Sequence, residues 1–521
     1  MRPLGAIVAV LAAALAAAPA AGAAPKRDFP RSFLWGTAIA GTQAEAGGRP
    51  SNADPRTDWW VWSRDPLNIE RGWVTGDPIE RGPGHWRLFR KDIDLAAERL
   101  NANAYRFSVE WSRIFPRSTA GVSVGRRIDA GDLRRLDRLA DHSALRHYAA
   151  ELRAADRRGL EPFVTLSHFS LPTWVHDPIA VRDALAVRGP DAELPKLARG
   201  GWLNASTVRE FRKYAAYLAW KLGRRVTFWT PLNEPLVVAA NGYVNVPGSF
   251  AGYFPPGAFS FSGAIRAVIN QVKANAAAYD AIHRFDGRAR VGPVNNMIAF
   301  TPADPASQRD REATRHADYL FNRLFLNAAV RGRWDLNVDG RIGPGERRPG
   351  SAGKADYLGV NYYFRGRVSG LAEPISERIE LLDFLPRTSY ATPAQPSLPA
   401  CPTTCSDFGS EIFTEGFGRS LRTAGAYGLP LYVTENGIAD ADDDQRAGYL
   451  VSHLRQVRAA MRSGQARVRG YLYWTLVDNF EWAAGYYPKF GMFSYDPATL
   501  RRIERPSARV FARIARTGRL P

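Results

Sequence analysis

Eight short apolar runs, separated by helix-like patterns, constrain the fold of this chain more than any other feature of its sequence. Each run is almost continuously apolar, as expected of a strand that is buried on both faces of a parallel sheet. Between the runs, apolar residues recur three and four positions apart, most clearly at 86–100, 145–158 and 207–223, which predicts amphipathic helices. The eight predicted strands span residues 33–40, 104–111, 162–169, 226–233, 290–298, 357–363, 429–435 and 471–478.

This alternation predicts an α/β fold, and a single (β/α)8 TIM barrel accounts for all eight strands. The alternative is a doubly wound sheet, in which a glycine-rich phosphate turn is expected after the first strand. The stretch FLWGTAIAGTQAEA contains no G-x-G-x-x-G pattern, so the sequence predicts no nucleotide cofactor. A barrel with its active site at the C-terminal strand ends is therefore the predicted architecture.

The first 23 residues are predicted to be a secretory signal peptide. Arg2 is followed by an apolar run at 4–18 and by Ala21-Gly22-Ala23, which fits the A-x-A pattern of a cleavage site. A transmembrane anchor is the alternative, but the run is short and rich in alanine, whereas a span needs about 20 strongly apolar residues. We therefore expect a secreted protein, extracellular or periplasmic, with the barrel at 24–521 and no membrane insertion after cleavage.

The net charge of +19 raises the possibility of a polyanion partner. However, only 8 of the 70 basic residues are lysines, and the arginines are scattered over predicted helix faces. The sequence thus favours a solvated basic surface and no nucleic-acid partner. Cys401 and Cys405 are too few for a disulfide scaffold, but one small loop-closing disulfide is plausible in an exported protein. The oligomeric state is not readable from the sequence.

Polar and aromatic side chains collect where the predicted strands end. Amides and hydroxyls that bond to many sugar hydroxyls, next to indole faces that cover C–H surfaces, are the groups a sugar ring requires. Two carboxylates, Glu234 and Glu435, then suffice to cleave a glycosidic bond. The strand-end residues are Gln43, Glu45, Arg106, His168, Asn233, Glu234, Asn361, Tyr363, Glu435 and Trp474, with Glu481 and Trp482 just beyond.

Each of these residues also has a simpler interpretation when it is taken alone. Asn436-Gly437 is a common turn dipeptide, His168 could be a hydrogen-bonded core histidine, and Arg106 could be a structural ion-pair partner. Tryptophans 35, 111 and 174 fit packing better than ligand binding. The joint pattern favours a site, because independent core residues have no reason to appear at the ends of successive strands.

The motifs of the chain resemble those of glycoside hydrolase family 1, the retaining β-glucosidases and β-galactosidases. The resemblance runs from residue 33 to about 496 and is closest to the archaeal β-glycosidase branch in the wording EWSRIFP, WVHDPIAVRD and GYFPPGAFS. The matching motifs occur in the family's order: FLWGTAIAGTQAEA, YRFSVEWSRIFP, VTLSHFSLPTW, GWLNASTVREF, TPLNEP, LGVNYY, YVTENG and WTLVDNFEW.

The resemblance implies roles for individual residues. Glu234 would be the general acid/base and Glu435 the nucleophile, with Arg106 and Tyr363 holding the nucleophile ionised and Asn233 bonding the sugar 2-hydroxyl. Retaining chemistry implies a carboxylate separation of roughly 5 Å. The residues implied to surround the sugar are Gln43, His168, Asn233, Asn361, Trp474, Glu481, Trp482 and Phe490.

The implied function is an exported retaining β-glycosidase that needs no cofactor for catalysis. It would release a terminal β-D-glucosyl, galactosyl or fucosyl residue from a small-molecule β-glycoside or oligosaccharide, with Glu481 favouring a glycone that carries no phosphate. A transglycosylase using the same carboxylates and a non-catalytic sugar-binding protein are the alternatives. The sequence departs from the family at Phe169, where many members have tryptophan, and at Ser410 and Thr414.

An insert before the sixth predicted strand carries a second motif. Asp335 to Glu346 fit D-x-N-x-D-G-x5-E, the spacing of an EF-hand calcium loop. The predicted ligands of a structural Ca²⁺ are Asp335, Asn337, Asp339, the Arg341 carbonyl and Glu346, with Ile342 as an apolar anchor. The alternative is an acidic solvated loop, and Pro344 argues against the usual exit helix.

Overall fold

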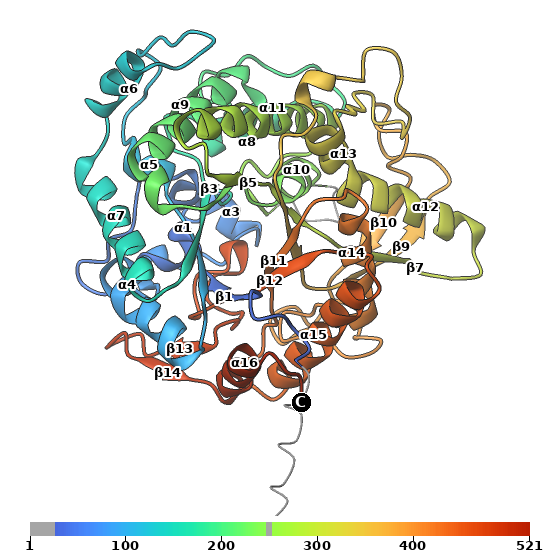
Figure 1. Cartoon of the computed structure of the whole chain (residues 1–521). Helices are drawn as coiled ribbons and strands as arrows, with labels where there is room; N and C mark the ends of the chain where they lie inside the picture. The colour runs from blue at the N-terminus through green and yellow to red at the C-terminus, as the bar shows by residue number, and fades with distance from the viewer. Residues whose placement is uncertain (1–26, 246–252) are drawn as a thin grey trace, which may run out of the picture.

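The computed structural model of the chain describes residues 27–245 and 253–521, and a parallel sheet lies at its centre (Figure 1). The predicted signal peptide at 1–23 lies outside the described residues. The sheet has the strand order β5-β4-β3-β2-β1-β12-β11-β8-β6. Its members are β1 (Leu34–Ala38), β2 (Ala104–Ser108), β3 (Glu161–Ser167), β4 (Phe228–Leu232), β5 (Arg290–Val291), β6 (Val294–Asn296), β8 (Leu358–Tyr362), β11 (Leu431–Asn436) and β12 (Val468–Trp474).

The fifth predicted strand, 290–298, is not continuous. It breaks at Gly292 and Pro293 into β5, which pairs with β4, and β6, which pairs with β8. Pro293 has no N–H to donate to a sheet, and a side chain at Gly292 would meet the Tyr357 carbonyl oxygen at 2.3 Å. The nine strands are therefore eight barrel strands with one broken in two, and the predicted TIM barrel is confirmed.

Helices surround the barrel, as Figure 1 shows, and several begin at the capping residues that the sequence provides. Asp141 accepts the N–H groups of Ser143 and Ala144 at the start of α7 (His142–Arg157), and Ser260 accepts that of Gly263 at the start of α11 (Phe261–Phe285). The predicted helix at 86–100 ends its α-helical part at Asp94 and continues as a π-helical turn over Leu95–Arg99. The longer helices are α4 (His85–Asp94), α6 (Ala130–Asp137), α7 (His142–Arg157), α8 (Pro178–Ala186), α9 (Ala205–Leu222), α10 (Pro235–Tyr243), α11 (Phe261–Phe285), α12 (Gln308–Asp318), α13 (Leu324–Arg331), α14 (Thr414–Gly425), α15 (Arg446–Arg462) and α16 (Pro506–Thr517).

Smaller elements lie outside the barrel sheet. Short α-helices are α1 (Gly41–Ala44), α2 (Asp58–Trp62), α3 (Pro66–Glu70) and α5 (Trp111–Ile114). A three-stranded sheet combines β7 (Ala299–Pro302), β9 (Arg365–Gly370) and β10 (Phe384–Arg387), and β13 (Phe493–Tyr495) pairs with β14 (Arg502–Glu504).

An aromatic layer fills the amino-terminal end of the barrel. Phe163 and Phe228 stack with ring centroids 4.2 Å apart, and Tyr357 and Tyr432 pack edge-on against Phe228. This end of the barrel interior is thus a packed core.

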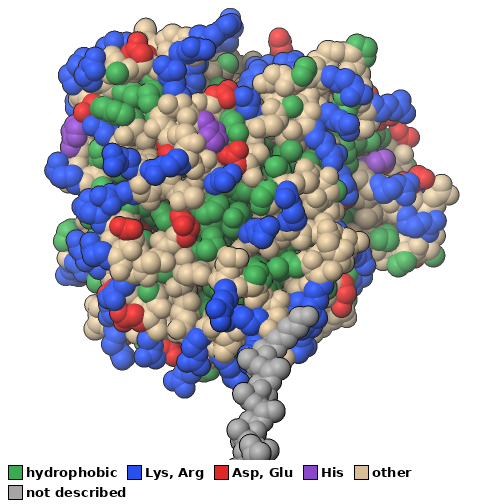
Figure 2. Space-filling model, viewed as in Figure 1, with side chains coloured by type: hydrophobic (Ala, Val, Ile, Leu, Met, Phe, Trp, Pro, Cys, Tyr) green, Lys and Arg blue, Asp and Glu red, His purple; other side chains and the backbone are tan. Residues whose placement is uncertain are grey.

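Basic side chains are dispersed on the face of the molecule that Figure 2 shows. Figure 2 shows Lys and Arg side chains dispersed over one face among acidic, apolar and uncharged ones. Within the described ranges, no helix is both long and apolar enough to cross a membrane. Cys401 and Cys405 form the disulfide that the sequence made plausible.

Candidate active site

Two carboxylates lie at the carboxyl end of the barrel, on β4 and β11. Glu234 follows β4 by two residues, and its backbone is left-handed with φ of 49°. The chain then enters α10 at Pro235. Glu435 lies within β11. Both side chains are buried, since the two residues are 6% and 3% exposed.

Arg106, in the middle of β2, connects the two strand ends. Its Nη1 forms an ion pair with Glu435 Oε1, and its Nη2 donates to Asn233 Oδ1 at 2.7 Å. Its Nε donates to Thr165 Oγ1 at 3.2 Å, and the residue is 1% exposed. The guanidinium is therefore held from three strands and stabilises negative charge on Glu435.

Tyr363 approaches Glu435 from the opposite side. Its hydroxyl donates to Glu435 Oε2 at 2.6 Å. Burial and the neighbouring Glu435 carboxylate raise the pKa of Tyr363 well above its usual value, so the hydroxyl keeps its proton. Glu435 thus accepts from a cation through one oxygen and from a neutral hydroxyl through the other.

Two amides hold Glu234 in place. Asn361 Nδ2 donates to Glu234 Oε1 at 2.6 Å, and Asn296 Nδ2 donates to the same oxygen at 3.0 Å. Asn361 is oriented in turn by Thr434, whose hydroxyl donates to Asn361 Oδ1 at 2.6 Å. Asn361 was predicted as a site residue from the sequence, but Asn296 was not. Asn296 lies on the one predicted strand, 290–298, for which no site residue was named.

The surroundings of Glu234 differ from those of Glu435 in their effect on charge. Burial and the nearby Glu435 carboxylate raise the pKa of Glu234 to about 8. The two amide donors and the more distant Arg106 act in the opposite direction but are outweighed. Glu234 therefore holds a proton near neutral pH, next to a carboxylate whose negative charge is stabilised by Arg106.

Aromatic rings form one wall of the site. The His168 ring lies nearly parallel to the rings of Trp474 and Trp482, with centroids 5.7 and 6.0 Å away. Its Nε2 lies 3.3 Å from Asn233 Nδ2, whereas its Nδ1 is buried without a hydrogen-bond partner. Burial and Arg106 lower the pKa of His168 well below its usual value, so the ring is neutral. Phe169 packs edge-on against Trp482 at 5.2 Å, where an indole would add an N–H donor.

Gln43 and Glu481 lie next to this aromatic wall. Gln43 Nε2 donates to the Phe480 carbonyl at 2.9 Å and to Glu481 Oε2 at 3.3 Å, while its Oε1 is buried without a partner. Trp474 Nε1 donates to Glu481 Oε1 at 3.3 Å. Burial raises the pKa of Glu481 to about 8, so this carboxyl is mostly protonated near neutral pH.

The remaining predicted residue, Phe490, packs edge-on against Tyr363 with centroids 5.9 Å apart. The structure thus brings the predicted catalytic and sugar-binding residues to one end of the barrel. Glu45, also named among the strand ends, faces away from this group, because its carboxylate accepts from Arg113 Nε at 2.6 Å and from the Tyr148 hydroxyl at 2.7 Å. Of the three tryptophans expected to pack, residues 35 and 111 are each 2% exposed.

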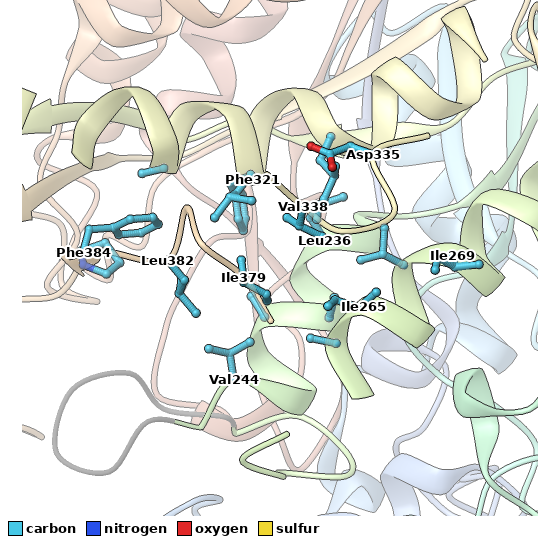
Figure 3. A pocket seen from close by; sticks show the side chains of 18 of the residues that line it. Leu236, Val244, Ile265, Ile269, Phe321, Asp335, Val338, Ile379, Leu382 and Phe384 are labelled. Carbon is cyan, nitrogen blue, oxygen red and sulfur yellow. The ribbon is translucent and has the colours of Figure 1, made fainter. Parts of the chain in front are cut away.

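The predicted calcium loop lies elsewhere, and one of its ligands, Asp335, lines an apolar cavity of about 170 Å³ (Figure 3). Asp335 and Val338 both contribute to its lining. Val338, at 4% exposed, is the apolar anchor of the loop, which corrects the expectation for the half-buried Ile342.

The oxygens of the loop mostly accept backbone N–H groups. Asp335 accepts from Asp339 and Gly340, and Glu346 accepts from Leu336 and Gly343. In the described part of the chain, the acidic residues of this loop do not form a group whose oxygens all lie within 4.8 Å of one another. Calcium binding at 335–346 therefore stays a prediction from residue spacing.

The geometry at the barrel mouth suits one kind of chemistry. A buried carboxyl that holds a proton lies opposite a carboxylate that accepts from a cation and a hydroxyl. Such a pair can protonate a leaving oxygen and attack the carbon that this oxygen leaves. The flanking amides and aromatic rings provide the contacts that a sugar ring needs.

Comparison with known proteins agrees with this chemistry. Residues 25–181 and 192–519 match glycosyl hydrolase family 1. The chain is 38% identical to the β-galactosidase of Saccharolobus solfataricus, over 94% of this chain and 96% of that protein. It is 30% identical to β-glucosidase A of Thermotoga maritima, over 95% of this chain and 99% of that protein. The crystal structure of the β-glycosidase from the hyperthermophile Thermosphaera aggregans superposes with a TM-score of 0.81 at 38% identity, covering 95% of this chain and 98% of that one.

Proposed function

Because the chain belongs to glycosyl hydrolase family 1, we propose that it releases the terminal, non-reducing β-D-glycosyl residue of an oligosaccharide or aglycone glycoside by double displacement. The observation that carries this proposal is the asymmetry of the two carboxylates. Glu234 has a pKa of about 8, and Glu435 accepts from Arg106 and Tyr363. An acid and a nucleophile are the two groups that a retaining glycosidase needs.

In the first step, a Glu435 oxygen attacks the anomeric carbon while the bond from that carbon to the leaving oxygen breaks. Glu234 gives its proton to the leaving oxygen, so the aglycone departs as a neutral alcohol. The product is a covalent glycosyl ester of Glu435. Asn233, held by Arg106 at 2.7 Å, is positioned to bond the sugar 2-hydroxyl, where contacts strengthen as positive charge develops on the ring.

In the second step, Glu234 acts as a base. Esterification removes the negative charge of Glu435, which was one cause of the high pKa of Glu234, so ionised Glu234 becomes easier to form. It takes a proton from water while the water oxygen attacks the anomeric carbon and Glu435 leaves as a carboxylate. Both residues then return to their starting protonation states, and the sugar keeps its β configuration.

We propose a neutral glucosyl, galactosyl or fucosyl glycone. Glu481, whether protonated or ionised, offers nothing that would neutralise a phosphate, and its Oε2 already accepts from Gln43. The names of the relatives, β-galactosidase and β-glucosidase, support the first two sugars.

Two measurements test the function. Proton NMR of the first sugar released from an aryl β-glycoside should show the β-anomer before mutarotation, whereas the α-anomer would refute double displacement. Initial rates on aryl β-glucoside, galactoside, fucoside and a 6-phosphoglucoside should rank the phosphate last. Accumulation of disaccharide in place of free sugar at low substrate concentration would favour the transglycosylase alternative.

Two further hypotheses rest on the sequence alone. Export through cleavage near Ala23 is tested by amino-terminal sequencing of the protein from the extracellular or periplasmic fraction of the producing cells. A structural Ca²⁺ at 335–346 is tested by thermal unfolding of wild-type protein and an Asp339→Asn variant, in saturating Ca²⁺ and in chelator. A calcium-dependent rise in Tm that the substitution leaves unchanged would contradict this site.

A further inference from the structure

A second acidic group lies behind the nucleophile strand, outside the site described above. Asp440, Asp442 and Asp444 follow β11 and precede α15. Each offers an oxygen, and these oxygens all lie within 4.8 Å of one another. Within the described ranges, this is the only group of three or more acidic, histidine or cysteine side chains that meets this distance. Asp442 and Asp444 are exposed, whereas Asp440 is completely buried.

Only one of the two oxygens of the buried Asp440 carboxylate has hydrogen-bond partners. Its Oδ2 accepts the backbone N–H groups of Gln445 at 3.1 Å and Arg446 at 2.7 Å. Its Oδ1 is shielded from solvent and has no hydrogen-bond partner. Because Oδ2 already serves two donors, Oδ1 is the oxygen left for the acidic group. A buried carboxylate oxygen next to other carboxylates calls for a positive charge or a proton.

The nearest arginine is engaged elsewhere. Arg446 donates through Nε to the Tyr473 hydroxyl at 2.9 Å, through Nη1 to Asp443, and through Nη2 to the carbonyls of Asp440 and Lys489. The Asp443 carboxylate accepts from Arg446 and from the N–H and hydroxyl of Ser507, so it is already engaged. The partner that Oδ1 lacks must therefore come from outside the chain or from a shared proton.

We propose that Asp440, Asp442 and Asp444 bind a hard divalent cation, with Ca²⁺ as the best match. All the ligand atoms are carboxylate oxygens, which suits Ca²⁺, Mg²⁺ and Mn²⁺ and disfavours metals that prefer nitrogen or sulfur. Oxygens that coordinate one Ca²⁺ at 2.3–2.6 Å lie within about 5 Å of one another, as these do. The exposure of Asp442 and Asp444 leaves room for water to complete the coordination shell.

The acidic group lies close in sequence to residues that pack against the candidate active site, so a bound ion would stabilise that region. The N–H of Asp440 donates to the Lys489 carbonyl at 3.0 Å. The preceding residue, Ala439, packs in one cluster with Trp474 and Phe490, both of which line the candidate active site. A cation at Asp440 would therefore brace the segment that follows the nucleophile strand against the segment carrying Phe490. We expect it to affect stability and KM more than kcat.

Calcium titration calorimetry on the chelator-treated full chain at pH 7.5 tests the proposal. We expect saturable Ca²⁺ binding with a Kd on the order of 10⁻⁴–10⁻³ M, the weak end of the range for protein Ca²⁺ sites. In the Asp442→Asn/Asp444→Asn variant, the affinity of this site should fall by tenfold or more. The substituted side chains are exposed, so the variant should unfold at the wild-type Tm in chelator but show a smaller calcium-dependent rise in Tm than the wild type.

An Asp339→Asn variant is the matched control, because it removes one carboxylate from the 335–346 loop and leaves the 440–444 group intact. It should keep the binding event that the double variant loses. No calcium binding by the wild-type chain, as expected if a shared proton satisfies Asp440, would overturn the proposal. Binding that is unchanged in the double variant would overturn it equally.

Discussion

Asn296 is one of two amides that stabilise the ionised form of Glu234, and removing its amide should raise the pKa of that carboxyl. Asn296 Nδ2 donates to Glu234 Oε1 at 3.0 Å, and this bond favours the ionised form, so its loss favours the proton. A hydrogen bond to a charged group contributes about 1.5–3 kcal/mol. Since Asn361 still serves the same oxygen, the lower figure applies, and it corresponds to about one pKa unit. The pKa of Glu234 should therefore rise from about 8 to roughly 9.

The assay is the pH dependence of kcat/KM for an aryl β-glycoside with a poor leaving group. This reaction needs protonated Glu234, so its rate falls on the alkaline side as that proton is lost. In Asn296→Ala the alkaline limb should move up by about one unit. Asn296→Leu removes the same donor but fills the space, so both variants should shift alike unless water replaces the amide.

Two controls isolate the effect. A dinitrophenyl glycoside needs little protonation of its leaving group, so its alkaline limb should not follow Glu234. Asn295→Ala removes a neighbouring buried amide that donates to the Asn296 carbonyl and not to Glu234. An alkaline limb that stays in place or moves to lower pH in Asn296→Leu would refute the reasoning.

Three further predictions concern single carboxylates. Glu435→Gln should lower kcat on an aryl β-glucoside by on the order of 10⁴-fold, and ordinary turnover in this variant would remove Glu435 from the role of nucleophile. Glu481→Gln should raise the inhibition constant of free glucose or galactose about fivefold more at pH 9 than at pH 6. The reason is that Glu481 ionises near pH 8 and then accepts charge-assisted hydrogen bonds. An equal rise at both pH values would contradict its assigned pKa. Glu411→Gln should lower the free energy of unfolding by about 3 kcal/mol at pH 7, since it leaves Arg365 and Arg367 without their buried partner. Burial acts to raise the pKa of Glu411, but these arginines lower it to about 2. The stabilisation that Glu411 provides is therefore complete above pH 4.5 and is lost as pH falls toward 2. In denaturant melts, the free energies of unfolding of wild type and Glu411→Gln should become equal near pH 2.

The barrel and most of its site were predictable because both leave local signals. A strand that is buried on two faces has an unbroken apolar sequence. All the residues of β2, β4 and β8 are indeed buried. The carboxyl ends of parallel strands meet at one end of a barrel, so the polar residue after each run could be assigned to a common site without knowing any distance.

What could not be predicted depends on contacts between segments. Asn296 was missed because it lies inside the predicted fifth strand at 290–298 and not at its end. Only the approach of β6 to β8 brings it to Glu234. The protonation of Glu481 follows from burial, which the sequence does not report. The spacing at 335–346 was visible, but not that its carboxylates would be engaged by backbone N–H groups.

The break in the fifth strand leaves the barrel weakly paired where β5 and β6 meet their neighbouring strands. β5 forms two residue pairs with β4, and β6 forms three with β8, so few backbone hydrogen bonds close the cylinder there. Local opening starts where such bonds are few, so among the barrel strands amide hydrogen exchange should be fastest in β5 and β6. Because Asn296 lies on β6, opening would also release Glu234 from one of its two donors. On heating, the enzyme should therefore lose its normal pH profile before the barrel unfolds.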